Sequence, residues 1–232
     1  MIAENIKNIK ENVEKTCFRI GKNPESVGLV AVSKTFSVEQ IQAAMRSGVH
    51  VFGENYVQEL LEKRKMLESE PILWHFIGHL QTNKVKYIAE WISMIHSVDS
   101  EGLVQEIQKR AEKIGRTIDV LMEVNTSAEA TKFGVNPEKA LDLLKKISVY
   151  PNVNVKGLMT IGPFTENKEE SRQAFKLLKT IFNEANEKNL TSHPLTELSM
   201  GMTHDYEIAI EEGSTMIRIG TAIFGTRTKA NE

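Results

Sequence analysis

The stretch Ser214-Thr-Met-Ile-Arg-Ile-Gly-Thr-Ala-Ile-Phe-Gly225 contains a short apolar run that ends in a glycine and a threonine. Met216, Ile217 and Ile219 are typical of a buried strand, and the cation Arg218 lies inside the run. A glycine at a strand end lets backbone N–H groups approach a ligand closely, and a threonine hydroxyl adds one more donor. Because clustered donors suit an anion, this stretch predicts a phosphate-binding loop after the last strand of a sheet.

The same unit, a short apolar strand followed or preceded by an amphipathic helix, recurs along the chain. Regular alternation without hairpin turns indicates a parallel sheet with right-handed crossovers. Eight such units in 232 residues, with no G-x-G-x-x-G after the first strand, favour a closed barrel over an open doubly wound sheet. We therefore predict the α/β class, with one domain over residues 1–232 that forms a (β/α)8 TIM barrel with an extra N-terminal helix. The expected strands cover residues 28–32, 49–52, 73–77, 94–98, 118–124, 153–159, 195–198 and the run around Arg218.

The composition restricts the class of protein. The formal net charge is -2, which gives no overall attraction to nucleic acid or to an acidic membrane. The single cysteine, Cys17, excludes an intrachain disulfide and is expected to pack in the core. No apolar run reaches the length of a membrane span, and the N-terminus lacks a signal-peptide core. We expect a soluble cytoplasmic protein, monomeric, with no nucleic-acid or membrane partner.

The residues that follow the predicted strands are the candidates for a functional site. In a barrel of this type the chemistry lies at the C-terminal ends of the strands, and phosphate commonly binds after strands seven and eight. The phosphate expectation therefore falls on Ser199, Gly201, Gly220 and Thr221. The other strand ends supply Lys34, Asn55, His79, Asn125 and Thr160.

Lys34 carries the most specific chemistry among these candidates. It directly follows a buried strand, where partial burial lowers the pKa of an amine. A neutral amine can attack a carbonyl and form a Schiff base. The ordinary alternative is an exposed lysine at the start of a loop. Together with a phosphate cradle, the amine points to a phosphorylated aldehyde or ketone, and both pyridoxal phosphate (PLP) and sugar-phosphate aldolase substrates qualify.

At this point the sequence resembles the pyridoxal-phosphate homeostasis proteins, single-domain PLP-binding barrels akin to the N-terminal domain of alanine racemase. The resemblance implies that PLP forms a Schiff base with Lys34 and that the protein acts in vitamin B6 homeostasis as a carrier or buffer. It further implies phosphate contacts from Ser199, Gly220 and Thr221, positions near the cofactor for Asn55 and Met200, and Arg218 facing the pyridine nitrogen. Thr203 stands where this family leads us to expect serine. The matching stretches are Leu29–Lys34, Phe52–Gln58, Trp74–Gln81, Gly157–Thr160, Leu198–Met202 and Arg218–Thr221.

Three functions remain open from the sequence. A PLP carrier or buffer with little or no turnover, handing the cofactor to PLP-dependent apo-enzymes, is the favoured hypothesis. An amino-acid racemase of low activity is the alternative, because Lys34 could serve one face of a substrate. The second base is a tyrosine of another domain in alanine racemase, and the chain ends a few residues after Gly225, so strong racemase activity is not expected. A class I aldolase acting on a sugar phosphate is the third hypothesis.

Other polar residues are expected to be structural. His75 and His79 lie around a strand end rather than on a helix, which does not favour a metal site. Glu123 sits on a long strand, where a hydrogen-bonded structural role is expected. The basic run Lys63-Arg64-Lys65 lies among glutamates and indicates a solvated helix face.

Overall fold

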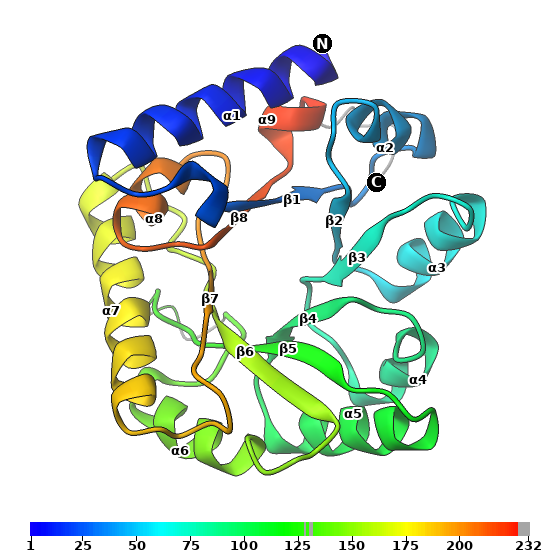
Figure 1. The fold of residues 1–232 in the computed structure, drawn as a ribbon, viewed down its shortest axis with the longest axis vertical. Coiled ribbons are helices and arrows are strands. Elements are labelled where there is room, and N and C mark those ends of the chain that lie inside the picture. The colour runs from blue at the N-terminus through cyan, green and yellow to red at the C-terminus, as the bar shows by residue number, and fades with distance from the viewer. Residues whose placement is uncertain (128, 130–131, 227–232) are drawn as a thin grey trace.

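A closed parallel barrel of eight strands forms the centre of the chain (Figure 1). The computed structural model describes residues 1–127, 129 and 132–226. Neighbouring strands pair in sequence order, and the barrel closes where β1 pairs with β8, with Val30 opposite Arg218. This confirms the predicted TIM barrel. The strands are β1 (Gly28–Val32), β2 (Val51–Glu54), β3 (Leu73–Phe76), β4 (Met94–Val98), β5 (Ile118–Glu123), β6 (Val153–Met159), β7 (Glu197–Ser199) and β8 (Met216–Ile219).

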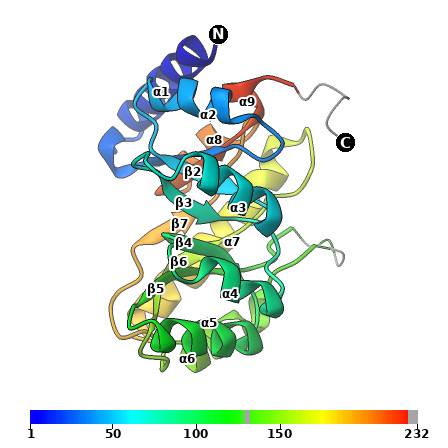
Figure 2. The same cartoon turned by 90° about the vertical axis from the view of Figure 1, so that its right-hand side faces the viewer.

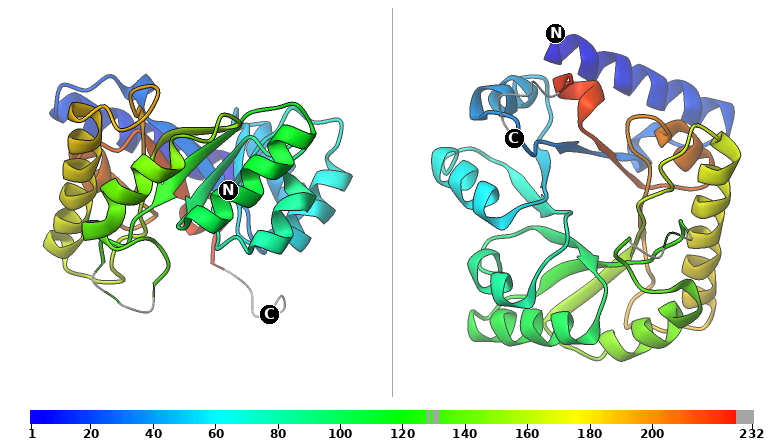
Figure 3. Two further views of the ribbon diagram at one scale, coloured as in Figure 1. Left: turned by 90° about the horizontal axis from the view of Figure 1, so that it is seen from below. Right: turned by 180° about the vertical axis from the view of Figure 1, so that it is seen from behind.

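Helices surround the barrel, and α1 precedes the first strand as predicted (Figures 1 and 3). Local sequence signals fix where several of them begin. Ser37 and Gln40 form a capping box at the start of α2, and the Asn136 side chain accepts from the backbone N–H of Glu138 at the start of α6. The helices are α1 (Ile2–Arg19), α2 (Val38–Met45), α3 (Val57–Met66), α4 (Val85–Ile88), α5 (Glu101–Lys113), α6 (Pro137–Ile147), α7 (Lys168–Glu187), α8 (Tyr206–Glu211) and α9 (Thr221–Phe224), with 3-10 turns η1 (Pro24–Ser26) and η2 (Thr82–Lys84).

The predicted boundaries differ from the structure in several places. The strand expected at 49–52 begins at Val51, because the backbone N–H of Val49 instead bonds to the Ala44 carbonyl and closes α2. The strand expected at 195–198 is shorter and shifted, as β7. Between β3 and β4 the helical segment is a single turn, α4, preceded by η2.

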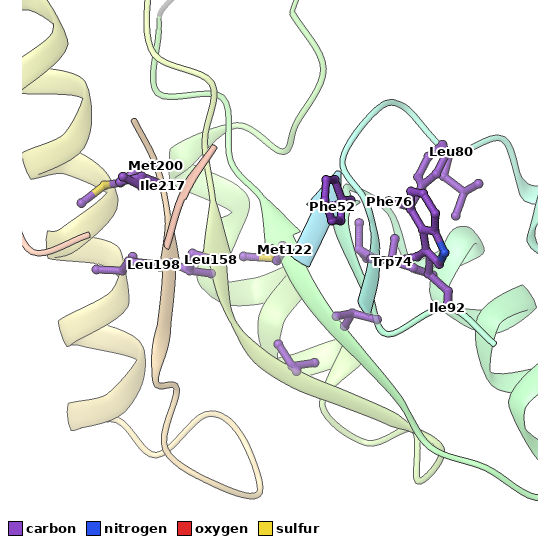
Figure 4. Packing of buried hydrophobic residues seen from close by; sticks show 14 of the residues in the cluster. Phe52, Trp74, Phe76, Leu80, Ile92, Met122, Leu158, Leu198, Met200 and Ile217 are labelled. Atoms are coloured by element: carbon purple, nitrogen blue, oxygen red, sulfur yellow. The ribbon is translucent and has the colours of Figure 1, made fainter. Parts of the chain in front are cut away.

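The core has two layers. The larger one fills the space between the strands and the helices, where the ring centroids of Phe52 and Trp74 are 6.0 Å apart and Met200 lies on the side of the sheet that faces α7 (Figure 4). The smaller one, of Met94, Leu121 and Met159 with Met216 against them, is a separate apolar cluster contributed by four strands. Cys17 is fully buried, as expected from its position on α1.

The N-terminal helix packs at the β8 side of the barrel. It contacts α2, α8 and α9, and Figure 2 shows α1, α2 and α9 grouped at one end of the molecule. The side-chain amide of Asn5 donates to the carbonyl of Ile223, which ties α1 to the short helix after β8. None of the helices within the described residues has the length and apolarity that a membrane crossing requires.

Candidate functional site

Lys34 occupies a tight turn directly after β1. The backbone N–H of Phe36 donates to the Ser33 carbonyl at 3.0 Å and closes the turn, so that Lys34 and Thr35 are its two central residues. Thr35 has φ +68, a left-handed conformation that a β-branched residue rarely adopts. Lys34 itself is half-buried. The surroundings must therefore hold this turn in place.

A buried cluster from β2 and α3 holds the turn. Lys63 of α3 donates from Nζ to the Ser33 carbonyl at 2.6 Å, to Glu54 Oε1 at 2.7 Å and to Glu59 Oε1 at 2.6 Å. Glu59 Oε1 also accepts the backbone N–H of Thr35 at 2.5 Å. The backbone on both sides of Lys34 is thus bonded to this cluster. Lys63 is only 6% exposed, so the prediction that the basic run forms a solvated helix face is wrong for this lysine.

The loop after β8 lies next to this turn, because β8 pairs with β1 (Figure 1), and the loop after β7 comes next, because β7 pairs with β8. A Cβ on Gly220 would lie 3.3 Å from the Val32 carbonyl oxygen, so glycine allows the two strand ends to approach closely. Gly201 has φ +93, and a Cβ there would lie 2.5 Å from Cβ of Ala209. Both glycines therefore suit loops that must stay close to the barrel. Thr203 Oγ1 accepts the backbone N–H of Ala222 at 3.3 Å and so joins the two loops.

Arg218 is buried and donates to polar groups at the ends of neighbouring strands. It is 4% exposed, and one terminal nitrogen donates to the Ser199 carbonyl at 2.8 Å and to Ser199 Oγ at 2.7 Å. The other terminal nitrogen donates to the Thr160 carbonyl at 2.8 Å. Burial lowers the pKa of Arg218 to about 10, with Glu123 and Asp205 opposing the shift, so the guanidinium is charged at neutral pH.

Two histidines extend this network across the barrel. His96 Nδ1 lies 3.0 Å from Ser199 Oγ, and His96 Nε2 lies 2.9 Å from His75 Nδ1. Burial lowers the pKa of His75 to about 4, and burial, His75 and Arg218 lower that of His96 well below its usual value. Both rings are neutral, so the hydrogen bonds can run from Arg218 through Ser199 and His96 to His75. No sequence pattern indicates this pair, because the two histidines lie on the neighbouring strands β3 and β4 and share no ligand spacing.

Glu123 ends β5 at the mouth of the barrel. It is 3% exposed, and it lines a cavity together with Asn55 and His79. Burial raises the pKa of Glu123 to about 7, with a further increase from Asp99 and an opposing effect of Arg218. The hydrogen-bonded structural role expected from the sequence stays a prediction, and Glu123 also forms part of the cavity wall. Within the described ranges, no cluster of three or more histidine, cysteine or carboxylate side chains could hold a metal ion.

The predicted site residues therefore fall into two groups. The Lys34 turn, Gly220 and Thr221 come together at the adjoining ends of β1 and β8. Ser199 is fully buried and its hydroxyl bonds to Arg218 and His96, while the side chain of Met200 packs in the outer core layer. Their predicted phosphate and cofactor contacts stay predictions, as do those of the first group.

Known proteins are similar to this chain in sequence and in fold. Residues 4–228 match the family described as alanine racemase, N-terminal domain. A pyridoxal phosphate homeostasis protein of Aquifex aeolicus is 45% identical over 225 residues, which cover 97% of this chain and 98% of the relative. The chain belongs to the pyridoxal phosphate homeostasis protein family. This confirms the resemblance drawn from the sequence motifs.

Solved structures agree with this family assignment. The structure of PipY from Synechococcus elongatus PCC7942 with PLP bound has a TM-score of 0.85 at 33% identity, and covers 97% of this chain and 100% of PipY. An alanine racemase of Clostridium difficile 630 has a TM-score of 0.75 at 15% identity, and covers 98% of this chain but 58% of the racemase. The likeness to the racemase shows a shared barrel fold.

Proposed function

We propose that this family member binds PLP as a Schiff base on Lys34 and acts in vitamin B6 homeostasis as a carrier or buffer with little or no turnover. The observation that carries the proposal is the adjacency of the Lys34 turn and the Gly220–Thr221 loop on the paired strands β1 and β8. An amine and a group of phosphate donors beside one another suit a phosphorylated aldehyde.

The residues around the strand ends fit this cofactor. Glycine at position 220 keeps open a space that a Cβ would narrow, and Thr221 begins α9 next to it. Thr203 offers a hydroxyl between the two loops, whereas the Ser199 hydroxyl is already bonded to Arg218 and His96. We therefore assign the phosphate to Gly220, Thr221 and Thr203, with Ser199 acting through Arg218. Asn55 and the backbone at Met200 complete the surroundings of the ring.

Arg218 is the reason to expect little chemistry. When bound, PLP supplies a conjugated ring that withdraws electrons from an attached amine, most strongly when its ring nitrogen is protonated. An arginine donates hydrogen bonds and stays charged, so the ring nitrogen of PLP that faces it would remain unprotonated. The fixed guanidinium therefore favours holding the cofactor over transamination or decarboxylation.

The comparisons support the carrier over the enzyme. The Aquifex aeolicus relative is named for homeostasis, and PipY has been solved with PLP. The racemase likeness supports only the barrel. We include in the proposal a monomeric state, a cytoplasmic location and transient contact with PLP-dependent apo-enzymes that receive the cofactor.

An absorption spectrum of the purified protein, before and after borohydride reduction and followed by peptide mass mapping, tests the proposal. We expect a visible band that is lost on reduction, with the pyridoxyl mass on the peptide that contains Lys34. Lys34→Ala should abolish the band, whereas Lys65→Ala, an exposed lysine on α3, should keep it. A colourless protein in which borohydride traps a sugar phosphate would indicate an aldolase. Loss of α-deuterium from an amino acid at turnover rates, abolished by Lys34→Ala, would indicate a racemase.

A further inference from the structure

A cavity of about 570 Å³ opens at the barrel mouth beside the proposed cofactor site. The ends of β2, β3 and β5 build it, and its walls are mainly apolar. Of the residues assigned above to the cofactor, Asn55 lines this cavity and the others do not, within the part of the chain that the structure describes. The apolar and aromatic side chains on its walls are Tyr56, Val57, Phe76, Ile77, Phe133 and Ile161.

One buried acidic residue stands out in this apolar setting. Glu123 is only 3% exposed, and it lines the cavity. A buried carboxylate is costly unless it is paired, and a bound ligand that supplies N–H groups and a positive charge reduces that cost.

We infer that this cavity binds a primary ammonium on a short apolar chain, with the nitrogen at the carboxyl of Glu123. An ammonium brings three donors and a positive charge, which match a carboxylate. The aromatic walls fit the apolar chain and also attract a cation. The site does not depend on Lys34, so it stands or falls separately from the attachment of PLP.

The charged groups around Glu123 set how the affinity depends on pH. Asp99 raises its pKa and Arg218, across the barrel, lowers it. His79 and Lys84 also line the cavity, and His79 stacks on Phe133 with its Nδ1 3.7 Å from Asp99. A carboxylate binds an ammonium better than a carboxylic acid does, so the affinity should rise as the pH increases through about 7.

Calorimetric titration of the Lys34→Ala protein with n-butylammonium at pH 6 and pH 8 tests the inference, because no Schiff base can form with that variant. We expect binding that strengthens at pH 8 and is several-fold weaker for n-butanol, the uncharged analogue. Adding Glu123→Gln should weaken n-butylammonium binding about tenfold or more and remove the pH dependence. Glu112→Gln, an exposed carboxylate on α5, is the matched control and should change neither.

A second variant and a second ligand keep the test decisive. Phe133→Ala removes an exposed aromatic wall, so the fold should survive and the amine should bind several-fold more weakly. Nα-acetyl-lysine methylamide distinguishes a lysine side chain from a small free amine as the source of the ammonium. Equal affinities for n-butylammonium in the presence and absence of the Glu123 carboxylate, or equal affinities for the amine and the alcohol, would overturn the inference.

Discussion

Lys63 of α3 and Arg218 of β8 are both buried cations, and their partners differ. Lys63 donates to two carboxylates, Glu54 and Glu59, and to a backbone carbonyl. Arg218 donates to two backbone carbonyls and one hydroxyl. Among the described residues, no carboxylate lies within 4.0 Å of its guanidinium, so it forms no ion pair with them. The charge of Lys63 is therefore neutralised inside the protein, whereas that of Arg218 is held by dipoles.

The difference in partners indicates that Lys63 supports the structure and that Arg218 can take part in recognising a ligand. The Lys63 cluster bonds to the backbone on both sides of Lys34 and leaves little capacity for a ligand. Arg218 keeps a charge in the barrel without a direct counter-charge, so an acceptor on a bound molecule would complete its shell. Burying the Lys63 cluster destabilises the ionised carboxyl of Glu54. Burial raises the pKa of Glu54 despite the opposing effects of Lys63 and Ser33, and Glu54 Oε2 meets no donor among the described residues.

The largest effect should come from removing Lys63. Lys63→Met leaves two carboxylates without their shared cation, and an uncompensated buried charge typically costs about 3–5 kcal/mol. We expect a loss of this size in the free energy of unfolding, measured by urea denaturation without PLP. Lys65→Met on the exposed face of α3 should change it by less than about 0.5 kcal/mol. Similar losses for the two variants would show that the Lys63 cluster does not stabilise the fold.

The fold was predictable because its signals are local. The apolar runs at residues 28–32, 94–98 and 153–159 each predict a complete strand, and the structure has strands over the same residues. Once the order of eight strands is known, the neighbours of each are fixed, so the approach of the Lys34 turn to Gly220 follows from the sequence.

Side-chain partners across the barrel were not predictable. Lys63 lies in a basic run among glutamates, and nothing local distinguishes the one lysine that turns inward to Glu54. His75 and His96 meet only because β3 and β4 pair in one particular register. The neutral state of these histidines and the raised pKa of Glu123 follow from burial, which a residue pattern does not give.

An intermediate effect should come from Glu123, whose pKa Arg218 lowers from across the barrel. A carboxyl with a folded pKa of about 7 and an unfolded value near 4.5 binds protons more tightly in the folded state. Its contribution to stability is therefore present below about pH 4.5 and is lost as the pH rises through about 7. Glu123→Gln should be more stable than the parent at pH 8 by up to about 3 kcal/mol, and this advantage should disappear near pH 4.5.

Urea denaturation of both proteins at several pH values checks this expectation. His75, with a pKa of about 4, has the opposite effect, because the unfolded state binds the proton more tightly and stability falls as the pH decreases from about 6.5. That effect is common to both proteins and cancels in their difference. A difference that does not change with pH would show that Glu123 ionises like an exposed carboxyl.

The smallest of the three effects should come from Arg218→Met. This variant leaves the carbonyl of Thr160 without a donor, which costs about 1–3 kcal/mol, whereas the Ser199 carbonyl keeps the backbone N–H of Thr160 and no carboxylate loses an ion-pair partner. We therefore expect a smaller loss of unfolding free energy than for Lys63→Met, together with a rise in the pKa of Glu123 that carbon-13 NMR of its carboxyl can follow. Arg218→Lys keeps the charge but not the forked donors, so it should lose part of the stability while leaving the Glu123 pKa nearly unchanged. If Arg218→Met lowered the free energy of unfolding as much as Lys63→Met, the guanidinium would be a structural cation like Lys63. The proposal that Arg218 takes part in ligand recognition would then be unsupported.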